Sequence, residues 1–129
     1  MRHFKILIVC CLVSGALALA VRAAVRPEPR ELTLIARGMA FYLSGDPTPN
    51  PRLIAGRGET LRITLRNEDR GMAHDLAIPS RAGGRKSTPV LRDAGESADL
   101  NLRAPEEAGE YVYLCSLHSG MMRGVLEVR

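Results

Sequence analysis

The sequence lacks several features that mark common classes of function. Its 129 residues include no tryptophan, three histidines and three cysteines, and its net charge of +4 is scattered along the chain. A nucleic-acid-binding face needs a basic stripe, so we expect no nucleic-acid partner. Apolar residues nowhere keep a helical spacing for three turns, and no internal repeat or second domain is visible. These absences leave one small domain of short strands.

The longest uncharged apolar run lies at the N-terminus and is short for a membrane span. Residues 6–20 follow a basic start and end in the small-residue sequence Ala-Leu-Ala. That order is typical of a secretory signal, whereas a spanning helix needs about 20 apolar residues. We predict a signal peptide over 1–20, a flexible lead-in over 21–30 and export to the periplasm or the extracytoplasmic face of the membrane. An uncleaved N-terminal anchor is the alternative, and only then is a membrane involved.

Cysteine usage narrows the function. Cys10 and Cys11 leave with the predicted signal peptide, so Cys115 is then alone in an oxidising compartment. A single cysteine there is unusual unless it is reactive, paired between chains or bound to a metal. Removal of residues 1–20 also takes away two basic residues and no acid, which lowers the net charge from +4 to +2. A balance this close to neutral favours no particular partner.

Residues 31–129 alternate short apolar stretches with turns. The clearest strand, 60–66 (TLRITLR), has period-two alternation, with one face buried and one exposed to solvent. The other expected strands are 31–36, 39–43, 74–78, 98–103, 111–115 and 124–129, with a short piece at 53–55 before a turn; the main expected loops are 44–51 and the mobile, basic 80–87. Short strands separated by turns predict an all-β sandwich or barrel.

The residues that carry chemistry lie close together near the C-terminus. Cys115 is followed by His118, and then by Met121 and Met122. A loop this short can place a thiolate, an imidazole and a thioether around one point, and these donors suit copper above other metals. Two imidazoles and a thiolate with a weak methionine form the blue-copper arrangement. His74 is the one other histidine beyond the predicted signal peptide, and it completes this set.

This segment resembles the cupredoxin family. The sequence CSLH at 115–118 has the C-x-x-H spacing of plastocyanins and amicyanin, and HSGMMRG at 118–124 is similar to the azurin loop. The resemblance implies a Greek-key β-sandwich over about 31–129 that binds one type 1 copper ion. Met122 fits the family's Met-x-Gly pattern, while Met121, whose spacing is amicyanin-like, stays a rival for the axial position. The implied ligands are His74, Cys115, His118 and Met122.

One position departs from the family pattern. Many cupredoxins have asparagine directly after the first histidine, whereas this chain has Asp75. An aspartate can still accept a backbone N–H, for instance near Ser116. Its negative charge near copper is expected to favour Cu(II) and so to lower the reduction potential.

The predicted function is transfer of single electrons by an exported, monomeric copper protein. Its donor and acceptor are expected to dock transiently near His118, on an apolar patch of Leu117, Met121 and Pro79, because weak electron-transfer encounters use small interfaces. We expect no enzymatic activity. A cysteine protease needs an oxyanion hole and a separate orienting residue, haem attachment needs C-x-x-C-H, and copper oxidases need further histidines.

The alternative is a copper delivery or storage protein of the cell envelope. It would use the same ligands but exchange its metal readily. Met72, Met121 and Met122 provide the basis for this alternative, because thioethers are soft donors that suit Cu(I).

Overall fold

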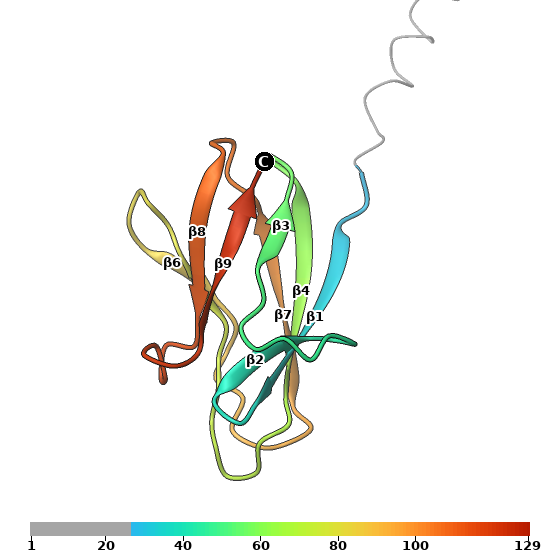
Figure 1. The fold of residues 1–129 in the computed structure, drawn as a ribbon, viewed down its shortest axis with the longest axis vertical. Coiled ribbons are helices and arrows are strands. Elements are labelled where there is room, and N and C mark those ends of the chain that lie inside the picture. Colours follow the sequence, from blue (N-terminus) through green and yellow to red (C-terminus); the bar gives the residue numbers. More distant parts are fainter. Residues whose placement is uncertain (1–26) are drawn as a thin grey trace, which may run out of the picture.

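The computed structural model describes residues 27–129, which form two stacked β-sheets without a helix (Figure 1). The predicted signal peptide, most of the lead-in, Cys10 and Cys11 lie outside the described residues. Within residues 27–129, no helix long and apolar enough to cross a membrane is present. The strands are β1 (Arg30–Arg37), β2 (Ala40–Leu43), β3 (Leu53–Ala55), β4 (Thr60–Asn67), β5 (Ala77–Pro79), β6 (Arg85–Ser87), β7 (Ser97–Arg103), β8 (Gly109–Leu114) and β9 (Arg123–Val128).

The two sheets exchange strands along the chain, as expected for a Greek-key sandwich. One sheet has the order β2-β1-β4-β7 and the other β3-β9-β8-β5-β6. β1 pairs with β4, and β3 with β9, in parallel, while the remaining named pairs are antiparallel. The predicted all-β sandwich is therefore confirmed.

The alternation in β4 explains how the core forms. Leu61, Ile63 and Leu65 are fully buried, while Arg62 and Arg66 on the other face are exposed. From the opposite sheet, Tyr111 and Tyr113 of β8 also point inward and are buried. Burial of such side chains contributes about 1.5 to 3 kcal/mol each, so the two inward faces hold the sheets together.

Two strands begin later in the structure than predicted, while β1, β7 and β9 begin one residue earlier than predicted and β8 two residues earlier. The stretch 74–78 does not begin a strand at His74, which makes only an isolated bridge to Leu91 before β5 begins at Ala77. The Leu76 N–H is bonded instead to the Thr88 hydroxyl (3.0 Å), which interrupts the ladder. Likewise β2 begins one residue later than predicted.

That later start is caused by the turn between β1 and β2. Gly38 and Met39 both have positive φ, at 57° and 65°. Two successive residues with positive φ are typical of the tight turns that join antiparallel strands. Met39 therefore belongs to the turn, and pairing begins with Ala40 opposite Arg37.

The stretch 80–87 forms the turn and the second strand of a β-hairpin and is not simply a mobile loop. Gly83 and Gly84 at its tip have φ of 93° and 74°, which glycine adopts without strain. The chain therefore reverses sharply and β6 pairs with β5. The side chains of β6 remain exposed, so the expectation of a solvated basic segment holds for them.

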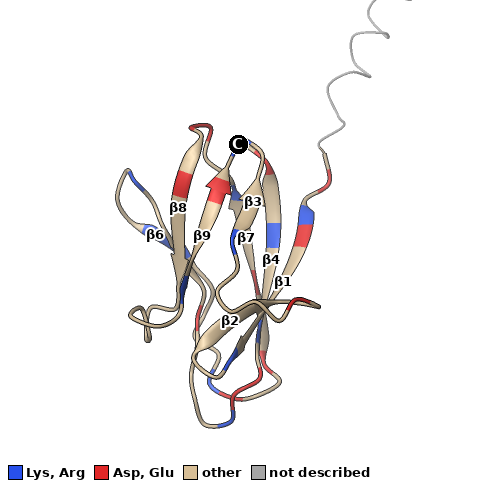
Figure 2. Ribbon diagram, viewed as in Figure 1, with Lys and Arg blue, Asp and Glu red and all other residues tan. Residues whose placement is uncertain are grey.

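The connections that carry the predicted ligands lie at one end of the sandwich. In Figure 1, the β4–β5 and β8–β9 connections lie in the lower half of the view, away from the C-terminus. The β1–β2 turn lies at the same end. Charged residues of both signs are interspersed over the strands of both sheets (Figure 2).

Candidate metal centre

Cys115 follows directly after β8 and is fully buried. Period-two alternation along the strand places it on the same inward face as Tyr111 and Tyr113. Its backbone N–H donates to the Met122 carbonyl (2.9 Å), and its carbonyl accepts the His118 N–H (3.2 Å). Burial raises the pKa of the Cys115 thiol. A cation beside the sulfur is therefore needed to stabilise the thiolate.

The turn after Cys115 brings His118 back towards the sulfur. The His118 carbonyl accepts the N–H groups of Met121 (3.0 Å) and Met122 (2.9 Å). The Met121 carbonyl in turn accepts a hydrogen bond from Asn50 Nδ2 (3.0 Å). As a result, His118 Nδ1 lies 3.6 Å from Cys115 Sγ. Local hydrogen bonding thus fixes two of the predicted donors side by side.

His74 is the third donor and comes from the β4–β5 connection. Its Nδ1 lies 3.9 Å from Cys115 Sγ, and its ring centroid lies 5.1 Å from that of His118. Its backbone N–H and C=O both pair with Leu91, at 2.9 and 2.8 Å. Its Nε2 lies 2.9 Å from Asp69 Oδ2. Because a carboxylate only accepts, the contact requires a proton on Nε2, and in a neutral imidazole Nδ1 then keeps its lone pair.

These three donors converge on one point. One ring nitrogen of each histidine and the Cys115 sulfur all lie within 4.8 Å of one another. Donors placed about 2.0 to 2.3 Å from a single ion are separated by roughly 3 to 4 Å, which matches the 3.6 and 3.9 Å contacts of the sulfur. A thiolate with two imidazoles suits copper. The residues present therefore fit the ion that the sequence predicts.

The two candidate methionines differ in burial. Met122 is fully buried in the same apolar cluster as Cys115, while Met121 is 62% exposed. A buried thioether is held by its packing, whereas an exposed methionine side chain is flexible. This difference supports Met122 over Met121 as a fourth donor.

Asp75 makes the kind of contact expected of it. It is 3% exposed, its Oδ1 accepts the Ser116 N–H (2.6 Å), and its Oδ2 accepts the Ser116 hydroxyl. The carboxylate therefore links the segment that carries His74 to the loop that carries Cys115. Its expected effect on the reduction potential stays a prediction.

The sequence patterns did not point to Asp69, which contacts His74. The Gly38 N–H donates to both Asp69 oxygens at 3.0 Å, and the Asp69 N–H donates to Asn67 Oδ1 (2.9 Å). Burial acts to raise the pKa of Asp69, but the hydrogen bonds from Gly38 and His74 outweigh it and lower the pKa overall. The sequence signal that could have pointed to Asp69 is Asn-x-Asp at 67–69, because an asparagine side chain often accepts the backbone N–H two residues later.

The surface at the metal end is apolar beside His118. His118 is partly buried, while Leu117 and Met121 are 48% and 62% exposed. Pro79 does not belong with them as predicted. It lies at the end of β5 and lines a separate cavity.

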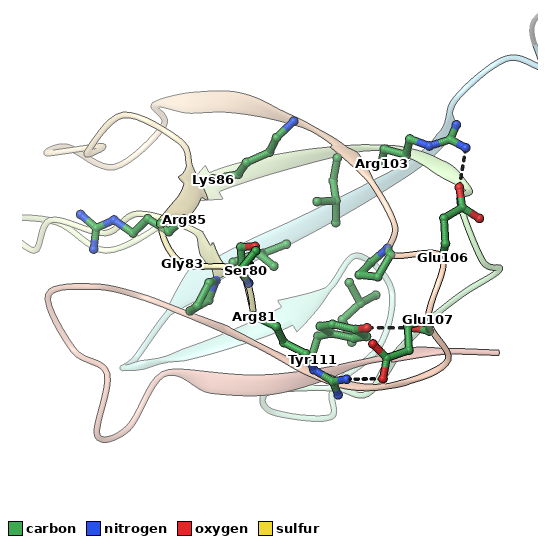
Figure 3. Close-up of a pocket in the computed structure, with 16 residues that line it drawn as sticks. Ser80, Arg81, Gly83, Arg85, Lys86, Arg103, Glu106, Glu107 and Tyr111 are labelled. Carbon is green, nitrogen blue, oxygen red and sulfur yellow. Dashed lines mark hydrogen bonds and ion pairs between the residues drawn. The ribbon is translucent and has the colours of Figure 1, made fainter.

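That cavity, of about 590 Å³, lies between the β5–β6 hairpin and the β7–β8 connection (Figure 3). None of the three clustered donors lines it. Arg81 extends across the Tyr111 ring, 4.3 Å from its centroid, to Glu107 (3.0 Å). The chemistry-bearing residues and the cavity are therefore different regions.

Comparison with known proteins gives matches by structure only. No family model matches the sequence, and no curated protein matches it significantly. Reduced rusticyanin matches with a TM-score of 0.63 at 19% identity, covering 81% of this chain and 82% of that chain. Auracyanin A, a "blue" copper protein from Chloroflexus aurantiacus, matches with 0.62 at 20%, covering 79% and 100%. An oxidised amicyanin variant matches with 0.53 at 22%, covering 83% and 88%. Identities this low show a shared fold.

Proposed function

We propose that this chain, which has the cupredoxin fold, is an exported protein that binds one type 1 copper ion and carries single electrons between redox partners. The observation that carries the proposal is the convergence of His74, Cys115 and His118 within 4.8 Å. Copper, when bound, supplies a couple, Cu(I)/Cu(II), that gains and loses one electron. The proposed ligands are those three residues with Met122 as the weak axial donor.

The surrounding residues supply the rigidity that such a couple needs. Cu(I) and Cu(II) prefer different geometries, so donors that cannot move reduce the rearrangement on electron transfer. Backbone hydrogen bonds connect Cys115, His118 and Met122 to one another. The backbone N–H and C=O of His74 are both hydrogen-bonded to Leu91. These contacts support a fixed site that accommodates both oxidation states.

The proposed partners are proteins that dock briefly beside His118. Leu117 and Met121 give an exposed apolar surface next to a partly buried imidazole. Small interfaces of this kind suit weak electron-transfer encounters, and we propose that the protein acts as a monomer. Export by a signal peptide over residues 1–20 belongs to the same proposal.

We propose a carrier and not an enzyme. His74 and Cys115 are both fully buried, and His118 is partly buried. A substrate therefore has no direct access to the first two side chains. Electron transfer needs only close approach to an edge of the site, which the surface around His118 provides.

Spectroscopy of the copper-loaded protein tests the proposal. We expect an intense visible absorption band and the electron paramagnetic resonance spectrum of a copper–thiolate site. Cys115→Ser should abolish the band, because the thiolate is its source. Colourless Cu(II) protein, or a spectrum unchanged by Cys115→Ser, would contradict the assignment.

A copper delivery protein is the second candidate, and one observation favours it. Met121 exposes a soft thioether beside the buried donors, where it could take part in metal exchange. Rapid loss of copper to a chelator, reduced in Met121→Leu, would favour delivery. Slow loss together with fast reversible redox would favour the carrier.

A further inference from the structure

We propose that Asp69 is a positioning residue that makes His74 a metal ligand, and that an amide cannot replace its carboxylate. The neighbouring Asp75, by contrast, tolerates the same replacement. This inference rests on the proposed function for its metal, but the proton arrangement that it specifies exists in the metal-free protein as well.

Two N–H donors converge on the Asp69 carboxylate. The Gly38 N–H lies 3.0 Å from both oxygens, and His74 Nε2 lies 2.9 Å from Oδ2. An ionised carboxylate has no proton to give, so His74 must donate from Nε2. A neutral imidazole has a single N–H, which leaves Nδ1 with a lone pair on the side of Cys115 Sγ, 3.9 Å away.

The position of Asp69 is itself built into the fold. Asn67, the last residue of β4, is fully buried and accepts the Asp69 N–H (2.9 Å). Its Nδ2 donates to the carbonyls of Met72 (2.8 Å) and Leu91 (3.3 Å). The carboxylate is therefore held between the β1–β2 turn at Gly38 and the histidine ring.

An asparagine at position 69 would place its NH₂ group against one of the two donors in either orientation. If its oxygen accepts from Gly38, its NH₂ group faces His74 Nε2 and can bond only when that nitrogen is unprotonated. The imidazole proton then moves to Nδ1, which blocks the metal-binding lone pair. If the amide is reversed, the oxygen still accepts from both donors, but the NH₂ group lies against the Gly38 N–H and opposes it. Asp69→Asn therefore harms the site in either orientation.

Asp75 receives a different pair of donors, and this makes it the matched comparison. Its oxygens accept the Ser116 N–H and the Ser116 hydroxyl. A hydroxyl can accept as well as donate, so an asparagine can take the N–H with its oxygen and donate its NH₂ to the hydroxyl. Asp75→Asn removes one negative charge near the site, as Asp69→Asn does, yet leaves every group paired.

The test measures the His74 tautomer and the copper affinity separately. Nitrogen-15 NMR of the metal-free protein should show His74 protonated at Nε2 in the wild type and in Asp75→Asn, and shifted to Nδ1 in Asp69→Asn. Cu(I) affinity, by competition with a chelator, should fall about 10- to 100-fold in Asp69→Asn, the usual range for loss of such a partner, and less in Asp75→Asn. Asp99→Asn, at an exposed position of β7, should match the wild type in both measurements.

Asp69→Ala separates the hydrogen-bond argument from a folding defect. Alanine places no donor against Nε2, so its affinity should lie between those of the wild type and Asp69→Asn. Equal tautomers and equal affinity losses in Asp69→Asn and Asp75→Asn would overturn the inference, and so would an alanine variant weaker than the asparagine variant. If the metal-free tautomers behave as stated but no copper binds, the positioning role stands and the proposed function fails.

Discussion

The metal end and the β5–β6 edge of the same sandwich are stabilised by different kinds of polar contact, buried in the first and exposed in the second. The buried polar and charged residues in the described part of the chain are Asn67, His74, Asp75 and Thr88. The first three hold the segments of the metal end, while Thr88, directly after β6, accepts the Leu76 N–H. None of their side-chain atoms that are fully buried lacks a partner. Burial of a polar group is unfavourable unless it is hydrogen-bonded. These side chains are therefore held in the one arrangement that keeps them all hydrogen-bonded.

The β5–β6 edge relies on exposed contacts instead. Arg81 is paired with Glu107, with side chains 52% and 76% exposed, and covers the Tyr111 ring. Exposed ion pairs of this kind contribute at most about 1 kcal/mol. In this molecule the cavity does not coincide with the candidate metal ligands, which lie where polar groups are buried and hydrogen-bonded.

Asn67→Ala gives the largest effect expected on stability and tests the metal end. The substitution removes the acceptor of the Asp69 N–H and leaves the Met72 carbonyl without its Asn67 partner. Unpaired buried groups cost about 1 to 3 kcal/mol each, so the free energy of unfolding of the metal-free protein should fall by about 2 to 4 kcal/mol in urea denaturation. Asn101→Ala, at an exposed position of β7, is the control and should change it by less than about 0.5 kcal/mol.

A fall below 1 kcal/mol for Asn67→Ala would mean that the network is not what holds the metal end. The comparison between the two regions would then lose its energetic basis. The His74 and Cys115 positions would instead have to be fixed by apolar packing alone.

Met122→Leu and Met121→Leu test which of the two methionines is the axial ligand. Leucine keeps the volume, so the free energy of unfolding should change by less than about 1.5 kcal/mol in both variants. The axial ligand tunes the reduction potential of a blue-copper site. Voltammetry should therefore show a shifted potential for the buried Met122→Leu and none for the exposed Met121→Leu. The reverse pattern would assign the axial position to Met121.

Much of the fold could be predicted because alternation is a local property. The strand at 60–66 differs from β4 by one residue, and the short piece expected at 53–55 forms β3. The shift at 74–78 and the change of 80–87 from loop to hairpin fall where side chains interrupt the ladder or where the backbone turns sharply. His74 lies in an isolated bridge, and the 80–87 hairpin depends on positive φ at two glycines. Patterns of polarity do not encode such backbone details.

The site divides in the same way. Cys115 and His118 could be predicted from spacing, because one turn joins them and its hydrogen bonds are local. The clustering of His74 with them depends on contacts between distant segments. Asn-x-Asp signals a local turn at Asp69, but its role was not predictable, since that role requires the β1–β2 turn, about thirty residues earlier in the chain, to lie beside the β4–β5 connection.

The spacing of Met122 and Gly124 has a packing reason that the sequence alone does not reveal. Gly124 pairs with Tyr113 across β8 and β9, and a Cβ at Gly124 would lie 2.3 Å from the tyrosine ring. The Tyr113 hydroxyl also donates to the Pro51 carbonyl (2.5 Å), which keeps the ring in place. A glycine two residues after the candidate ligand therefore allows β9 to pair with β8 beside the Tyr113 ring.

Arg81→Ala gives the smallest effect and tests whether the β5–β6 edge is independent of the metal end. The arginine loses an exposed ion pair and the Tyr111 ring contact, so the free energy of unfolding should fall by less than about 1 kcal/mol. Amide exchange in β6 should nevertheless become faster, because Arg81 ties the hairpin to Glu107 and to the Glu110 carbonyl (3.3 Å). The visible spectrum and the reduction potential should not change.

Arg85→Ala, which removes an arginine with no ion pair among residues 27–129, is the control for charge. A spectral change in Arg81→Ala alone would mean that β5 transmits the state of the hairpin to His74, and the two regions would then have to be treated as one.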